Sequence, residues 1–485
     1  MAQRSVLTQT TQPKEDHTTI RYRWIHRFFT TDVSPDNHPI VELQRRAIWI
    51  SIAIILQAGN EILKRHVLQS RPRRWQRFVL VSTVLLTTAG ILLFAVTIAM
   101  CFMPPEFSND GTSLDTNAAV LLLHGKNPYT DSNMLDLARH FSIQPNWTTP
   151  LQRGQFANRM DYPSEVDFQT VLDTDLKAGT APEFESKVSY PALSFLTLVP
   201  FAYFNDMNVL PFYLLSYLVL IGIAWKVARP EMRIWVLLLG LANVSMWAST
   251  KGANLDIFYT LLIVLVWLLR DKRWSSAIFL GLALASKQIA WFFIPFYMIM
   301  VLRHYGLKEC VYRVVIAGSI GVAINLPFIL WNPQAWVAGI MAPVADPMFP
   351  VGVGLVGLSA THLLPFFPKW VYTALEGGAM AACLVWYWRI CKKVPEAAML
   401  LAVLPLFFAW RSLGSYFYCV AYPMFILMAA KIPLGLKPRT VESRSHAVDF
   451  AYGRSERPLA VPSALSFRTT SYSAPIFHYR TTLRM

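Results

Sequence analysis

The sequence predicts an all-α protein that folds as a polytopic bundle of transmembrane helices, and three observations lead to this fold class. Of its 485 residues, 54% are hydrophobic and only 15% are charged, whereas soluble domains average about 25% charged residues. Apolar runs recur through the middle of the chain, several of them close to the ~20 residues that a helix needs to cross a bilayer. The runs are continuous in Leu, Ile, Val and Ala and do not alternate with polar residues, as membrane β-strands do.

The first element is a polar, basic region at residues 1–77, which we expect in the cytoplasm. Within it, the run AIWISIAIILQA at 47–58 is apolar for about 12 residues, short of the ~20 that a crossing helix needs. We expect an interfacial helix at this run, and a crossing helix is the alternative that the sequence leaves open.

The transmembrane domain is predicted at 78–431 and begins with a crossing helix at 78–102. The basic cluster Arg71–Arg77 directly precedes this helix, and positive charges beside a membrane span mark its cytoplasmic side. The hydrophilic stretch at about 104–187 is therefore expected on the extracytoplasmic face, as a large first loop that carries short surface helices.

The remaining apolar segments follow closely after this loop. They are predicted at 189–204, 208–228, 232–248, 254–269, 274–286, 289–302, 311–330, 369–390, 397–409 and 415–431. Alternate links between them are rich in Lys and Arg, and all these links can face the cytoplasm if 189–204 enters the membrane and returns without crossing. With a similar non-crossing stretch at 340–365, this arrangement gives about ten crossings with both termini inside.

The formal net charge of +15 is concentrated at the two ends of the chain and in the short links. This distribution argues against nucleic-acid binding, because no basic stripe lies on a soluble domain. The tail at 432–485 is rich in Ser, Arg, Thr and Pro, so we expect it to be disordered in the cytoplasm. Its basic residues could also contact anionic membrane lipids.

Three turns predicted for the outer face carry a cation, against the positive-inside trend: Lys251, Lys287 and Arg411. The helices around Lys287 have about 13 residues each and rise only about 20 Å, so this lysine should lie within the outer half of a ~30 Å hydrocarbon core. A cation there needs a water-filled recess or a counter-charge. We expect the three cations to bind a phosphate, and their neighbours Asn254, Asp256, Gln288 and Tyr416 to support it. Structural cations that reach the headgroups are the alternative.

Acidic residues gather around the stretch SLDTNAAVLLLHGKNPYTDSN at 113–133 of the first loop. It predicts a short helix followed by a turn at Asn127–Tyr129, and we expect Asn127 and Tyr129 to support the site. Asp110 and Asp115 could each cap this helix, or one could deprotonate an acceptor hydroxyl beside the cationic recess. The tripeptide DTD at 173–175 leaves a divalent metal open, but no metal or other cofactor is indicated.

Five motifs in order resemble glycosyltransferase family 87, a member of the GT-C superfamily of polytopic transferases: HGKNPYTDSN, SYPALSFLTLVPF, TKGANLDIFYTLL, ALASKQIAWFFIPF and WRSLGSYFY. The resemblance covers roughly residues 78–431. It implies a GT-C-like fold in the cell membrane, inner or plasma, with the active site on the extracytoplasmic face. It also implies inverting transfer of a sugar, often mannose, from a polyprenyl-phosphate donor to a glycolipid or glycan acceptor of the envelope.

The resemblance further implies an acidic catalytic residue in the first outer loop. Asp110 and Asp115 both precede the HGKNPY turn at plausible spacing, and the spacing slightly favours Asp110. A transporter or lipid flippase without transferase chemistry is the main alternative, because such proteins place ionisable groups near the bilayer midplane. Glu376, inside the segment 369–390, is the residue that favours this alternative.

Overall fold

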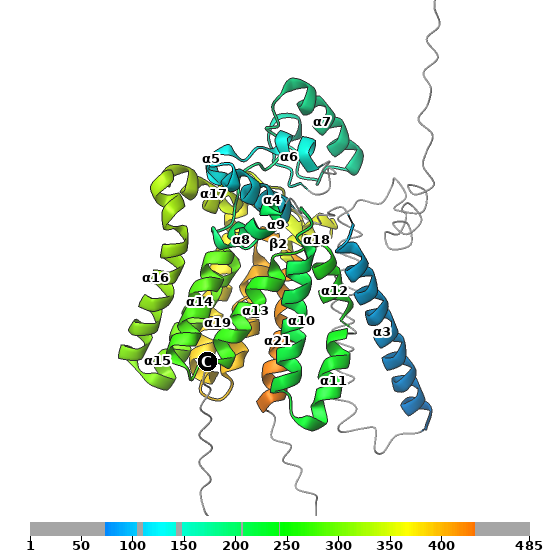
Figure 1. Cartoon of the computed structure of the whole chain (residues 1–485), viewed down its shortest axis with the longest axis vertical. Coiled ribbons are helices and arrows are strands. Elements are labelled where there is room, and N and C mark those ends of the chain that lie inside the picture. Colours follow the sequence, from blue (N-terminus) through cyan, green and yellow to red (C-terminus); the bar gives the residue numbers. More distant parts are fainter. Residues whose placement is uncertain (1–72, 104–109, 142–147, 205–206, 242, 432–485) are drawn as a thin grey trace, which may run out of the picture. The chain divides into compact units, whose positions relative to one another are not determined.

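The computed structural model describes residues 73–103, 110–141, 148–204, 207–241 and 243–431. Helices dominate this part of the chain (Figure 1). The interfacial helix expected at 47–58 and the tail at 432–485 lie outside the described residues.

The longer helices account for most of the predicted apolar segments. They are α3 (Arg73–Met100), α10 (Leu210–Val227), α11 (Pro230–Leu241), α13 (Asp256–Leu268), α14 (Arg273–Ser286), α15 (Phe293–Tyr305), α16 (Leu307–Trp331), α17 (Pro333–Ala345), α19 (Lys369–Ile390) and α21 (Gly414–Lys431). Among the described residues, two helices, α10 and α16, are both long and apolar enough to cross a membrane.

Several predicted spans are broken into shorter helices. The span 232–248 is divided between α11 and α12 (Val244–Lys251), and Asn243 caps α12 by accepting a 3.1 Å hydrogen bond from Met246 N. The span 397–409 is a series of short turns, namely η5 (Pro395–Ala397), α20 (Ala398–Leu401) and η6 (Leu404–Phe408). Pro395 and Pro405 stand at the first turns of η5 and η6, where a missing backbone N–H is tolerated.

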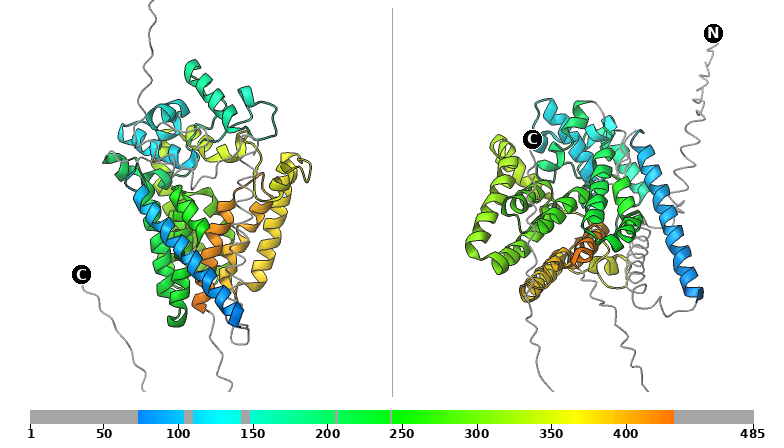
Figure 2. Two further views of the ribbon diagram at one scale, coloured as in Figure 1. Left: turned by 90° about the vertical axis from the view of Figure 1, so that its right-hand side faces the viewer. Right: turned by 60° about the horizontal axis from the view of Figure 1, so that its bottom comes forward.

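The bundle is held together by close helix crossings and a large aromatic core. α14 packs along both α13 and α16. A Cβ atom on Gly281 of α14 would lie 2.7 Å from Ala317 O, so only glycine permits this approach of α14 to α16. Trp267, Phe293 and Tyr297 are fully buried beside this crossing. Figure 2 shows α3, in blue, in front of the bundle in the left view and at its right-hand edge in the right view, and α3 contacts α10, α11 and α12.

The chain between α3 and α10 forms short helices at one end of the bundle (Figure 1): α4 (Asp110–Leu123), α5 (Pro128–Asp131), α6 (Met134–Phe141) and α7 (Glu165–Ala178). We call residues 148–187 the loop lobe. Ser164 and Asp167 close a capping box at the start of α7, and Gly179, with φ +75°, ends it. Phe156, Phe168 and Phe184 form the core of the lobe.

The helix expected within 113–133 is present as α4, and it is buried against the bundle. Residues Gly111 to Ala119 are all buried. α4 packs against α8 (Leu193–Leu196) and α9 (Val199–Tyr203), the two short helices that occupy the predicted segment 189–204. At ~1.5 Å per residue, neither of these helices could span a bilayer.

A short parallel strand pair lies near α4 in the bundle's loop end. Strand β1 (Val351–Gly352) pairs with β2 (Arg411–Ser412), and α18 (Leu355–Ala360) follows β1. Gly352 has φ +142°, and a Cβ atom there would lie 2.1 Å from Ser412 O, so this position requires glycine. The pair fixes the backbone of Arg411 from a segment that is distant in the sequence.

Candidate active site

The candidate site is built around Asp115, on the face of α4 that meets the bundle. Thr112, one turn earlier, donates a 2.7 Å hydrogen bond to Ala253 O and so attaches α4 to the turn between α12 and α13. Asp115 is 0% exposed, and Ser194 Oγ donates to its Oδ1 at 2.9 Å. Its Oδ2 is buried and has no hydrogen-bond partner in the described part of the chain.

Burial raises the pKa of the Asp115 carboxyl well above its usual value of 3.8, although the Ser194 hydrogen bond and the charge of Lys287 oppose this shift. Asp110 lies in electrostatic range and raises the pKa further. A carboxyl with one anchored oxygen and one unpartnered oxygen is the arrangement that a general base requires, because the free oxygen can accept a proton from a bound group.

A buried ion pair lies within electrostatic range of Asp115. Lys287, at the end of α14, places Nζ 2.5 Å from Oδ1 of Asp256, the first residue of α13. Their side chains are 6% and 1% exposed. The sequence predicts that Lys287 needs a counter-charge or a recess, and the structure supplies the counter-charge within the protein. A donor phosphate would therefore have to share Lys287 with Asp256.

Three tyrosine rings surround the ammonium of Lys287. The distance from Nζ to the ring centroid is 5.0 Å for Tyr190 and 5.9 Å for both Tyr259 and Tyr416. Such cation–π contacts stabilise a desolvated cation. Tyr416, which the sequence predicts as a supporting residue, therefore presents its ring to the ammonium.

Arg411 and Asp110 flank this group. Arg411, on β2, is half-buried, and its guanidinium lies 2.9 Å from Met348 Sδ. Arg411 is within electrostatic range of Tyr190 and Tyr416, and Lys287 is also within electrostatic range of Tyr416. Asp110 begins α4, is half-buried, and lies within electrostatic range of Asp115 and Tyr190. The structure thus brings both candidate acids, Lys287 and Arg411 into electrostatic range of one cluster of residues.

Lys251, the third candidate cation, is the half-buried last residue of α12. It directly precedes the turn that α4 contacts through Thr112. Asn254, in the same turn, accepts a 2.9 Å hydrogen bond from Asp256 N and thereby sets the start of α13. Asn254 supports the site by positioning Asp256.

The other predicted supporting residues hold the backbone around the site. Gln288 donates to the carbonyl oxygens of Ser189 and Ile340. Asn127 caps α5 by accepting from Tyr129 N at 3.0 Å, and the Tyr129 hydroxyl donates to Tyr190 O at 2.8 Å. These bonds fix the chain on both sides of Tyr190.

Sequence analysis missed four residues of the site: Tyr190, Ser194, Tyr213 and Tyr259. Tyr259 lies inside the motif TKGANLDIFYTLL. Ser194 and Tyr190 lie inside the motif SYPALSFLTLVPF, which was the available signal. Tyr213, in α10, has no polar neighbour in sequence, and only the packing of α10 against α4 and the 253–255 turn reveals it.

A second charged cluster joins the loop lobe to the segment after α17. Asp346 pairs with Arg153 at 2.8 Å and with Lys187 at 2.7 Å. Burial and the charge of Asp346 raise the pKa of Glu185 to about 7. Leu151 forms a β-bridge with Met348, so the lobe is connected to the residue that contacts Arg411.

The DTD tripeptide does not form a cation site in the structure. Asp173 is exposed on α7, where its Oδ1 accepts from Gln169, whereas Asp175 is buried beside Glu183. Within the described ranges, no group of three or more His, Cys, Asp or Glu residues could hold a metal ion.

No protein-family model, no curated protein and no solved structure matches this chain.

Proposed function

We propose that this protein is an integral membrane glycosyltransferase with a GT-C-like helical bundle. It transfers a sugar, such as mannose, from a polyprenyl-phosphate donor to a glycolipid or glycan acceptor on the extracytoplasmic face of the cell membrane. The observation that carries the proposal is the unpartnered, fully buried Oδ2 of Asp115 beside the Lys287–Asp256 pair.

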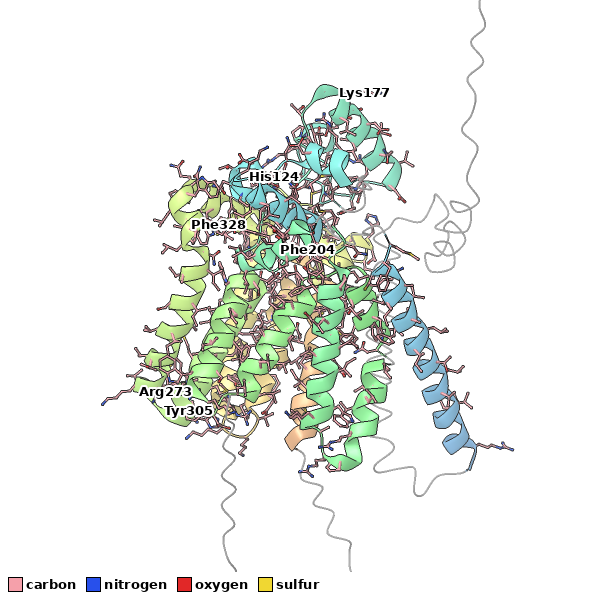
Figure 3. All side chains as sticks on the ribbon, in the orientation of Figure 1. His124, Lys177, Phe204, Arg273, Tyr305 and Phe328 are labelled. Carbon is pink, nitrogen blue, oxygen red and sulfur yellow. The ribbon has the colours of Figure 1, made fainter. Side chains whose placement is uncertain are left out.

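The distribution of exposed aromatic side chains supports the membrane arrangement. At the end of the bundle that carries α4, the exposed aromatics include Tyr203, Phe204, Trp331 and Trp370. At the opposite end they include Trp225, Trp274, Tyr305, Tyr312, Trp386 and Trp388. Figure 3 shows Phe204 and Tyr305 at these two ends. Trp and Tyr gather at both membrane–water interfaces, so the bundle between the two groups would lie in the hydrocarbon core.

The basic residues support the orientation. Arg270, Lys272 and Arg273 follow α13 at the end of the bundle opposite α4, and Arg273 is visible there in Figure 3. Cytoplasmic links carry an excess of Lys and Arg. The loop lobe and α4 would therefore face the extracytoplasmic side.

In the proposed reaction, Asp115 Oδ2 takes the proton from an acceptor hydroxyl. The hydroxyl oxygen forms a bond to C1 of the donor sugar, while the bond from C1 to the phosphate oxygen breaks and the phosphate leaves with the electron pair. Attack from the face opposite the phosphate inverts the configuration at C1. Lys287 and Arg411 stabilise the charge that grows on the leaving phosphate.

The test compares Asp115→Asn with Asp110→Asn in purified protein given a labelled polyprenyl-phosphate sugar and cell-envelope extract. Loss of a general base typically costs ~100- to 10,000-fold in rate, so we expect Asp115→Asn to lose transfer by this factor and to keep donor binding. Asp110→Asn should lose less, because Asp110 is half-exposed at the start of α4. Wild-type turnover by Asp115→Asn would refute the role of this carboxylate.

One observation favours transport as a second candidate function. Glu376 is half-buried within α19, on the face that also carries the buried Tyr372 and Cys383. An ionisable group inside a membrane helix commonly serves a substrate or proton path. The test is movement of a polyprenyl-phosphate lipid between the leaflets of reconstituted vesicles. Movement that is lost in Glu376→Gln but kept in Asp115→Asn would establish transport instead of transfer.

A further inference from the structure

Several buried polar atoms near the candidate site lack partners, and two of them are complementary in their chemistry. The hydroxyl of Tyr213, in α10, and Oδ2 of Asp115, in α4, have no hydrogen-bond partner among the described residues. Both residues are 0% exposed. A buried polar group without a partner destabilises the folded state, so such groups mark places where a bound molecule supplies the missing bond.

Packing brings these two residues to the same place. Tyr213 belongs to a buried cluster with Ala119 and Ala253. Ala119 lies one helical turn after Asp115 on the same face of α4, because residues four apart are neighbours on a helix. Asp115 lies within electrostatic range of the Tyr213 hydroxyl. The two groups do not hydrogen-bond to each other, since each is unpartnered.

The missing ligand group is defined by what each atom can do. A carboxylate oxygen only accepts hydrogen bonds, and a phenol can donate one. A group that fits between them must donate to Asp115 Oδ2 and accept from the Tyr213 hydroxyl, which is what an alcohol does. A phosphate oxygen could accept from Tyr213 but would be repelled by the Asp115 carboxylate.

We propose that Tyr213 and Asp115 form the subsite for the acceptor hydroxyl, and that the occupant is a carbohydrate alcohol. This inference rests on the proposed transferase function. Tyr213 donates to one lone pair of the acceptor oxygen while Asp115 accepts its proton. The second lone pair is thereby directed at C1 of the donor sugar. Ser194 holds the other carboxylate oxygen and so fixes the direction of the accepting one.

The test removes the phenol oxygen alone. Tyr213→Phe should fold as stably as the parent, because the hydroxyl has no protein partner. The matched control is Tyr217→Phe, one turn later on α10, whose equally buried hydroxyl donates to Gly240 O at 2.7 Å. Tyr217→Phe should lose thermal stability and keep the acceptor affinity of the parent.

The probes are hexyl glucoside, hexyl galactoside and hexyl mannoside, offered with labelled polyprenyl-phosphate sugar to protein in lipid nanodiscs. Tyr213→Phe should raise the acceptor KM by about 5- to 10-fold, the usual effect of one lost hydrogen bond, and should leave donor affinity unchanged. If transfer occurs and both variants keep the parent's acceptor KM, the subsite is overturned and the transferase function stands.

Direct binding separates this inference from the proposed function. If no variant transfers sugar, the proposed function fails, and calorimetric titration of the three glycosides decides the subsite. Weaker binding to Tyr213→Phe than to the parent and Tyr217→Phe supports a carbohydrate hydroxyl between Tyr213 and Asp115. Equal binding, or no binding of any probe to the parent, overturns it and leaves water as the occupant.

Discussion

Removal of the Lys287 ammonium should have two separable consequences, one for stability and one for donor binding. In Lys287→Met, Asp256 keeps its buried position, with a side chain 1% exposed, but loses its counter-charge. At the observed 2.5 Å separation, the Coulomb attraction is about 7 kcal/mol at an effective dielectric constant of ~20. Desolvation of both ions offsets much of this, and loss of one partner of a buried pair typically destabilises by ~3–5 kcal/mol.

Two comparisons make the magnitude interpretable. Arg159→Met removes one partner of the 3.0 Å pair with Asp167, whose side chains are both 40% exposed, so it should cost at most ~1 kcal/mol. The double variant Lys287→Met with Asp256→Asn removes both buried charges and should return to within about 1 kcal/mol of the parent. Thermal unfolding of the variants in nanodiscs measures these differences.

Donor affinity and single-turnover rate of the double variant then isolate the chemical role of the lysine. If Lys287 binds the donor phosphate, the double variant should bind donor more weakly and transfer sugar more slowly than the parent, even though its stability is restored. A double variant with parental stability, affinity and rate would show that Lys287 is structural. A Lys287→Met variant no less stable than Arg159→Met would refute the energetic reasoning itself.

Three further outcomes are expected. For orientation, Lys177→Cys should react with an impermeant maleimide added outside intact cells, and Lys272→Cys should not. The reverse pattern would place the candidate site on the cytoplasmic face. For the strand pair, Gly352→Ala should lower stability and transfer together, because its Cβ would clash with the carbonyl oxygen of Ser412. The control Gly222→Ala has no atom within 4 Å of the new Cβ and should be neutral or stabilising by ~0.5–1 kcal/mol. Equal behaviour of the two variants would contradict the close approach of the strands. For pH, burial and the neighbouring Glu183 carboxyl raise the pKa of Asp175 to about 7. Protonated Asp175 therefore stabilises the loop lobe fully below pH ~4, and this stabilisation is lost as pH rises through about 7. Hydrogen exchange of α7 should speed up over this range, and the same pH dependence in Asp175→Asn would refute the assignment.

Local features of the site could be predicted from the sequence. The short apolar arms at 274–286 and 289–302 predict a lysine that needs a counter-charge or a recess, and the structure buries Lys287 between α14 and α15 beside Asp256. The capping and apolar residues at 113–133 predict the helix found as α4. These predictions succeed because helix periodicity, caps and breaks depend on residues within a few positions of one another.

The partners of these residues were decided by tertiary structure. Asp256 lies 31 residues from Lys287 in the chain, and Ser194 lies 79 residues from Asp115. The small polar residues at the start of α4 are compatible with a surface helix in the sequence, but here they are buried because Gly111 lets the Tyr190 ring pack against the helix. Sequence alone pointed to Asp115 and Lys287 as candidates, but it missed Ser194, which holds the Asp115 carboxylate. Only the packing of α4 on the bundle decided that Asp115 is buried with a free oxygen, because contacts between distant segments follow from side-chain shape and not from local pattern.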